Sequence, residues 1–163
     1  QNNLIDHFRD IKVIGWSTLI FGFLLYFSDR FSLDKNIKEN FDYKSAMIIG
    51  LFQILSLVPG VSRSGIVITA ARLLNFERFD AAKISFLLSI PTLVAVSLYG
   101  LKNIISFEEA QFSYLNIFCI FFSCIFSFIT IKYFLKFIQK FSLKVFVIYR
   151  VILGIIILAL AYL

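Results

Sequence analysis

The sequence predicts an all-α membrane protein, a polytopic helix bundle that contains a re-entrant helix–loop–helix hairpin. Composition is the first observation: 60% of the 163 residues are hydrophobic, 21 are Phe and only 16% are charged. An average soluble domain is about half apolar and about a quarter charged. The second observation is four apolar stretches near the length that crosses a bilayer, and the third is a further apolar stretch broken by Pro and Gly. Together they exclude a soluble enzyme, a disordered tail and a disulfide scaffold.

Four transmembrane helices are expected within one membrane domain over residues 1–163. A hydrocarbon core about 30 Å thick needs about 20 helical residues. The stretches that qualify are residues 11–28, residues 81–101 with one internal proline, residues 113–131, and residues 143–163. Bulky apolar side chains in such helices face lipid without a loss of solubility, which accounts for the many Phe residues.

Residues 45–75 differ from these stretches because neither of their apolar halves can cross the membrane alone. The first half, residues 46–58, extends about 20 Å as a helix at 1.5 Å per residue. The segment PGVSRSG at residues 59–65 then interrupts the helix with a proline and two glycines. Loop backbone cannot face lipid, so this segment must be buried in protein or line a watery cavity. The sequence therefore predicts a re-entrant hairpin.

Loop charges orient the helices. Lys132, Lys136, Lys140 and Lys144 form a basic loop without an acid, which places that loop in the cytoplasm. If residues 45–75 re-enter, both chain ends lie outside; if they span as one bent helix, the N-terminus lies in the cytoplasm. This asymmetry also explains the net charge of +6, so no nucleic-acid partner is expected.

The interrupting segment carries the chemistry. Arg63 at membrane depth would cost roughly 2.5 kcal/mol even on a lenient insertion scale, so an anion is expected beside it. Ser62 and Ser64 can donate hydrogen bonds, while Gly60 and Gly65 allow close approach of the backbone. The unpaired N–H groups at the start of the second half-helix also favour an anion, phosphate above all. A phosphate at this depth points to a lipid phosphate.

Other readings remain open around this segment. Arg63 could instead pair with a carboxylate and lock two helices together. Gln53 and Thr69 are candidates for a supporting layer behind the site, although Gln53 is equally explained as a contact between helices. Arg72 and Arg150 are expected to extend to the cytoplasmic interface.

The run GLFQILSLVPGVSRSG at residues 50–65 resembles the second signature of the undecaprenyl-diphosphatase (bacitracin-resistance) family. The run SFLLSIP at residues 85–91 resembles the helix that follows it in that family. The resemblance implies an inverted-repeat membrane phosphatase that hydrolyses undecaprenyl diphosphate to the monophosphate in the bacterial plasma (inner) membrane, which recycles a lipid carrier for cell-wall synthesis. By this resemblance Ser62 and Arg63 are catalytic, and Ser64, Gly60 and Gly65 shape the phosphate-binding loop.

The family's other signature, a glutamate-rich segment followed by a Ser-rich turn and a His, has no counterpart in the sequence. The chain is therefore expected to correspond to the C-terminal portion of the family fold and to be inactive alone. His7 lies in a polar leader, and Glu108 and Glu109 in a polar loop, so all three are expected to be solvated. The resemblance implies a divalent cation, Mg²⁺ or Ca²⁺, whose ligands are not in this chain.

Two other functions fit the same residues. A lipid-phosphate transporter or flippase would also point half-helices at an anion near the midplane. A non-catalytic remnant could bind lipid phosphate or pair with another chain, and a homo-oligomer is left open. The expected partners are thus a polyprenyl diphosphate lipid and the bilayer.

Overall fold

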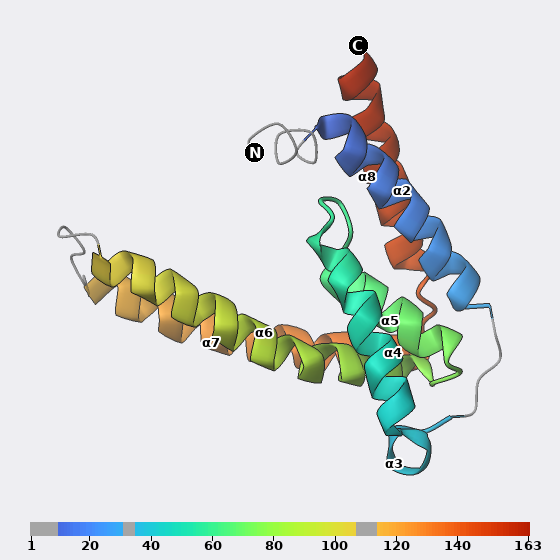
Figure 1. The fold of residues 1–163 in the computed structure, drawn as a ribbon, viewed down its shortest axis with the longest axis horizontal. Coiled ribbons are helices and arrows are strands. Elements are labelled where there is room, and N and C mark those ends of the chain that lie inside the picture. Colours follow the sequence, from blue (N-terminus) through green and yellow to red (C-terminus); the bar gives the residue numbers. More distant parts are fainter. Residues whose placement is uncertain (1–9, 31–34, 107–113) are drawn as a thin grey trace.

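The computed structural model describes residues 10–30, 35–106 and 114–163 (Figure 1). Apart from an isolated bridge between Lys35 and Phe76, regular structure in these ranges is helical. The elements are α2 (Ile11–Ser28), α3 (Ile37–Asn40), α4 (Tyr43–Ile54), the short 3₁₀ turn η1 (Leu55–Leu57), α5 (Arg63–Leu73), α6 (Arg78–Ser106), α7 (Tyr114–Lys140) and α8 (Lys144–Tyr162). The all-α prediction is confirmed.

Four of these helices, α2, α6, α7 and α8, are long and apolar enough to cross a membrane. The chain is thus a multi-pass membrane protein. Helix α6 is a few residues longer at both ends than predicted, and the largest difference is that α7 continues to Lys140. The predicted basic loop is therefore wrong: Lys132, Lys136 and Lys140 lie on α7, and Lys144 begins α8. The helix continues because no Pro or Gly interrupts residues 114–140.

The spanning helices form two antiparallel pairs (Figure 1). One pair is α2 with α8, and the other is α6 with α7, which extends away from the first pair. Helix α5 lies between them and packs against α2, α4 and α6. Residues 116–131 of α7 are exposed along their whole length, which suits an apolar helix that faces lipid.

Glycines allow α2 and α8 to approach closely. A Cβ atom added to Gly15 would lie 2.5 Å from Leu158, and one added to Gly154 would lie 2.8 Å from Leu19. Small residues at contact positions are typical of helix pairs in membranes, because dispersion forces must replace the missing hydrophobic drive. These glycines therefore fix the spacing of the α2–α8 pair.

Helices α4 and α5 form a helix–loop–helix hairpin (Figure 1). Asp42 caps α4 by accepting a hydrogen bond of 2.8 Å from the Ser45 N–H. Helix α5 ends where Asn75 takes a positive φ of 72° and the Phe76 N–H donates 3.0 Å to the Ala71 carbonyl. The chain thus turns back on itself instead of forming one bent helix; re-entry of the hairpin into the membrane stays a prediction.

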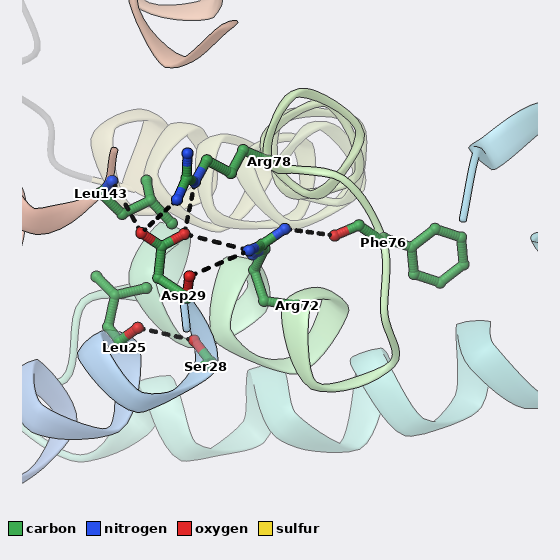
Figure 2. Close-up of polar contacts among 7 residues, drawn as sticks. All are labelled: Leu25, Ser28, Asp29, Arg72, Phe76, Arg78 and Leu143. Atoms are coloured by element: carbon green, nitrogen blue, oxygen red, sulfur yellow. Dashed lines mark hydrogen bonds and ion pairs between the residues drawn. The ribbon is translucent and has the colours of Figure 1, made fainter. Parts of the chain in front are cut away.

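Asp29, at the end of α2, joins four elements (Figure 2). Its carboxylate lies 3.4 Å from Nη2 of Arg72 and 2.7 Å from Nε of Arg78, and it accepts 3.3 Å from the Leu143 N–H. Arg72 also donates 3.1 Å to the Phe76 carbonyl and is 4% exposed. The expectation that Arg72 extends to the interface is therefore wrong, because a buried carboxylate lies within its reach.

Candidate functional site

The interrupting segment begins with a tight turn. The Val61 N–H donates 3.1 Å to the Val58 carbonyl, and Gly60 has a φ of +88°. Proline at the second position and glycine with positive φ at the third are the signature of a type II turn. The sequence PG at residues 59–60 therefore determines this reversal.

Side chains of α2 contact the backbone of this turn. The Ser17 hydroxyl donates 2.5 Å to the Pro59 carbonyl. The Thr18 hydroxyl donates 2.7 Å to the Ile14 carbonyl within α2 and lies 3.3 Å from the Gly60 carbonyl. A Cβ atom on Gly60 would collide with Ser17 Oγ. The loop thus contacts the interior of a helix long enough to span, away from that helix's ends.

Ser62 begins α5 as its N-cap. Its hydroxyl oxygen accepts 3.2 Å from the Gly65 N–H, its carbonyl accepts 2.9 Å from the Ile66 N–H, and its Oγ lies 3.3 Å from Ser64 Oγ. The N–H groups of Arg63 and Ser64 bond to no residue that the structure describes. Two free donors and two hydroxyls therefore meet at the positive end of a helix, an arrangement that favours an anion.

Arg63 occupies the first position of α5 and is half-buried. It forms no hydrogen bond or ion pair with any residue in the described ranges. The alternative in which an arginine of this hairpin pairs with a carboxylate is realised by Arg72 and not by Arg63. The guanidinium of Arg63 thus keeps its charge available for a ligand.

A cavity of about 490 Å³ adjoins the loop. Its polar end is formed by Thr18, Gly60, Ser62, Ser64, Gly65 and Arg150. The remaining walls are apolar side chains, with one tyrosine, from α2, α5, the α7–α8 region and α8; Arg63 is not among the lining residues. No carboxylate or imidazole of the described residues lines this cavity, so the described lining combines one cationic side chain with mostly apolar walls.

Arg150, like Arg72, does not lie where the sequence predicted. Its Nη2 donates 2.9 Å to the Gly60 carbonyl, and the residue is only 8% exposed. It does not extend to the interface, because the loop carbonyl lies closer and solvates the guanidinium inside the protein. The signal was present in the sequence: an arginine well inside an apolar stretch without a nearby acid, the same feature that singled out Arg63.

The two proposed supporting residues lie away from the cavity lining. Gln53 donates 2.9 Å from Nε2 to the Thr92 hydroxyl on α6, while its buried Oε1 has no hydrogen-bond donor among the described residues. The Thr69 hydroxyl donates 2.8 Å to the Gly65 carbonyl within α5. Gln53 thus links α4 to α6, and Thr69 binds the backbone of the first turn of α5. An effect of either residue on the site stays a prediction.

The described residues do not fit a metal ion. Within them no three His, Cys, Asp or Glu side chains lie close enough together to bind one, and the cationic end of the cavity would repel one. His7, Glu108 and Glu109 lie outside the described residues. The divalent cation, Mg²⁺ or Ca²⁺, therefore stays a prediction.

The chain matches a known protein family and curated relatives along almost its whole length. The family model described as bacitracin resistance protein BacA matches residues 1–156. An undecaprenyl-diphosphatase of Pelagibacter ubique (strain HTCC1062) is 51% identical over 160 residues, which are 98% of this chain and 61% of that protein. Another undecaprenyl-diphosphatase, from Saccharophagus degradans, is 43% identical over 155 residues, covering 94% of this chain and 57% of that protein.

The chain thus spans about three-fifths of the length of these relatives. The family match covers residues 1–156. It therefore includes the turn at residues 58–61, Ser62 and Arg63 at the start of α5, and Arg150 on α8. The chain belongs to the bacitracin resistance protein BacA family.

Proposed function

We propose that this chain acts in the hydrolysis of undecaprenyl diphosphate to undecaprenyl phosphate and inorganic phosphate, at the bacterial inner membrane. The names of its relatives support this reaction, and hydrolysis of that phosphoanhydride would return the lipid carrier for cell-wall synthesis. The observation that carries the proposal is the start of α5: free N–H groups and the hydroxyls of Ser62 and Ser64 meet beside a cavity, and Arg63 at the same turn has no partner among the described residues.

This arrangement suits phosphoryl transfer. In the proposed reaction, water attacks the terminal phosphorus, the bond from that phosphorus to the bridging oxygen breaks, and the lipid monophosphate leaves. Negative charge spreads over the phosphoryl oxygens in the transition state, so catalysis depends largely on positioned cations and N–H donors. Arg63 and the N–H groups of Arg63 and Ser64 would supply that stabilisation.

Ser62 is better suited to donate a hydrogen bond than to attack phosphorus. Its oxygen already accepts from the Gly65 N–H, and a serine hydroxyl without an adjacent base is a poor nucleophile. None of the described residues around the cavity can act as that base. We therefore expect the group that activates water, together with any divalent cation, to come from outside the described residues.

A chimera tests the proposal. The matching 160 residues of the full-length Pelagibacter ubique protein are replaced by the corresponding residues of this chain, and phosphate release from undecaprenyl diphosphate is measured in detergent micelles. We expect turnover by the chimera and a loss of about 10²–10³ in kcat for Arg63→Gln, the usual effect of removing one transition-state donor. Lys132→Gln, which removes an exposed charge from α7, is the matched control and should change nothing.

Two outcomes contradict the proposal. A folded chimera that moves the lipid across vesicles without releasing phosphate would identify a transporter. Full activity in Arg63→Gln would remove this loop from the chemistry. Turnover by the purified 163-residue chain alone would show instead that the activating group lies within it.

A further inference from the structure

We infer that Arg150 and the first turn of α5 form a second phosphate-binding subsite inside the cavity, separate from Arg63. This inference rests on the proposed function, because it assigns a second phosphoryl position to the same loop. Its ligand is a phosphate group, either attached to a lipid or free.

The guanidinium of Arg150 lies directly against the start of α5. Nη2 donates 2.9 Å to the Gly60 carbonyl, and Nη1 would lie 2.9 Å from a Cβ atom placed on Gly65. Ser62 and Ser64, whose hydroxyls can donate, line the same cavity. Donors from two helices thus face one space of about 490 Å³.

The charges in that space share one sign. The Gly60 carbonyl solvates the guanidinium of Arg150 but does not neutralise it, and the start of α5 adds its own positive partial charge. Arg72 provides the contrast, since its buried guanidinium has the Asp29 carboxylate as a counter-ion. Arg150 is 8% exposed, and within the described ranges no acidic residue lines the cavity. A buried cation without a counter-ion is strongly unfavourable, so a bound anion is the natural complement.

The donors favour a phosphate among anions. A guanidinium fork can contact two oxygens of one phosphate, and the hydroxyls of Ser62 and Ser64, which line the same cavity, can donate to its other oxygens. The apolar walls, including Phe134, Phe146 and Leu153, suit hydrocarbon attached to that phosphate. Arg63 is not among the described residues that line this cavity, so Arg150 is the arginine that this subsite would use.

Binding to the purified chain in neutral detergent tests the subsite. Inorganic phosphate and farnesyl phosphate are titrated by calorimetry into the wild-type chain and its variants. We expect Arg150→Gln to weaken binding of both probes by about tenfold to a hundredfold, and Arg150→Lys to restore part of it. Gly65→Ala should also weaken binding, because the added methyl group displaces the flexible end of Arg150 while retaining its charge. Lys132→Gln controls for net charge.

The probes distinguish the two sources of phosphate. Tighter binding of farnesyl phosphate indicates a lipid phosphate, and equal binding indicates free phosphate. Wild-type affinity in both Arg150→Gln and Gly65→Ala, or no saturable binding by the folded wild-type chain, would overturn the inference. Turnover by the chimera tests the proposed function separately. An active Arg150→Gln chimera with unchanged KM refutes the subsite and leaves the proposed hydrolysis standing. An inactive wild-type chimera that still binds phosphate refutes the proposed hydrolysis and leaves the subsite standing.

Discussion

Replacing Asp29 with Asn removes the negative charge that holds two arginines and the start of α8 together (Figure 2). The side chains of Arg72 and Asp29 are 5% and 4% exposed. Arg72 would therefore keep a buried charge and lose the Asp29 carboxylate beside it. We expect this single substitution to be among the most destabilising in the chain.

The magnitude follows from the exposure of each partner. Removing one partner of a buried ion pair costs about 3–5 kcal/mol, because the other charge remains buried. Arg78 is 37% exposed at its side chain, so water replaces much of its interaction and it adds less than about 1 kcal/mol. The Asn oxygen can still accept from the Leu143 N–H. The expected loss in free energy of unfolding is therefore about 3–5 kcal/mol.

Unfolding by sodium dodecyl sulfate in mixed micelles, followed by circular dichroism, measures this loss. Asp42→Asn is the matched control: Asp42 is an exposed N-cap, and Asn caps a helix as well as Asp does. The double variant Asp29→Asn with Arg72→Met should be more stable than Asp29→Asn alone, since it also removes the buried guanidinium of Arg72. A loss below about 1 kcal/mol for Asp29→Asn would refute the reasoning, because the buried pair would then contribute no more than a surface pair.

Three further outcomes are expected, from unfolding, activity and hydrogen-exchange measurements. Gly60→Ala should lower the free energy of unfolding by at least about 1–3 kcal/mol, because φ is +88° and the methyl group would meet an α2 hydroxyl. Gly50→Ala, with open space around its Cβ, should instead stabilise α4 by about 0.5–1 kcal/mol, and equal effects of the two would contradict the turn. Gln53→Met removes one hydrogen bond but also removes a buried oxygen that has no donor among the described residues. The free energy of unfolding should therefore stay within about 1 kcal/mol of wild type, and turnover by the chimera should not change. Lost turnover would place Gln53 in the site. The hydrogen bond from the Ser45 side chain, and to a smaller extent that from the Ser45 N–H, lowers the pKa of Asp42. The stability that Asp42 gives to α4 as its cap is therefore fully present above the ordinary carboxyl pKa. It is lost as pH falls through the lowered pKa. Hydrogen exchange of the first turn of α4 should follow that loss in the wild type and not in Asp42→Asn.

The spanning helices could be predicted from sequence because their signal is local. Residues 11–28 match α2 at both ends, since apolar sequence lies between Asp10, which caps the helix, and Asp29, which follows it. Composition could not predict how the pairs diverge, because that depends on which faces contact each other. The continuation of α7 to Lys140 was missed because charge was taken as the sign of a loop.

Three arginines show which part of the site could not be predicted from the local sequence. Arg63, Arg72 and Arg150 all lie at apolar stretches without an adjacent acid, and the sequence assigned the anion site to the one beside Pro and Gly. Their surroundings differ only through tertiary contacts: Asp29 reaches Arg72 from α2, and the Gly60 carbonyl reaches Arg150 from the loop. No spacing in the sequence reveals either contact, because each joins segments far apart in the chain.

The contacts behind the loop explain how it can receive a phosphate at all. A backbone turn presents carbonyl oxygens as well as N–H groups, and exposed oxygens would repel phosphate. Ser17 binds the carbonyl of Pro59 from α2, and Arg150 binds the carbonyl of Gly60 from α8. With these two oxygens occupied by donors, the free groups at the start of α5 are N–H groups and hydroxyls. The α2–α8 pair thus contributes to the site without any acid of its own, by fixing which backbone atoms of the loop remain available to a ligand.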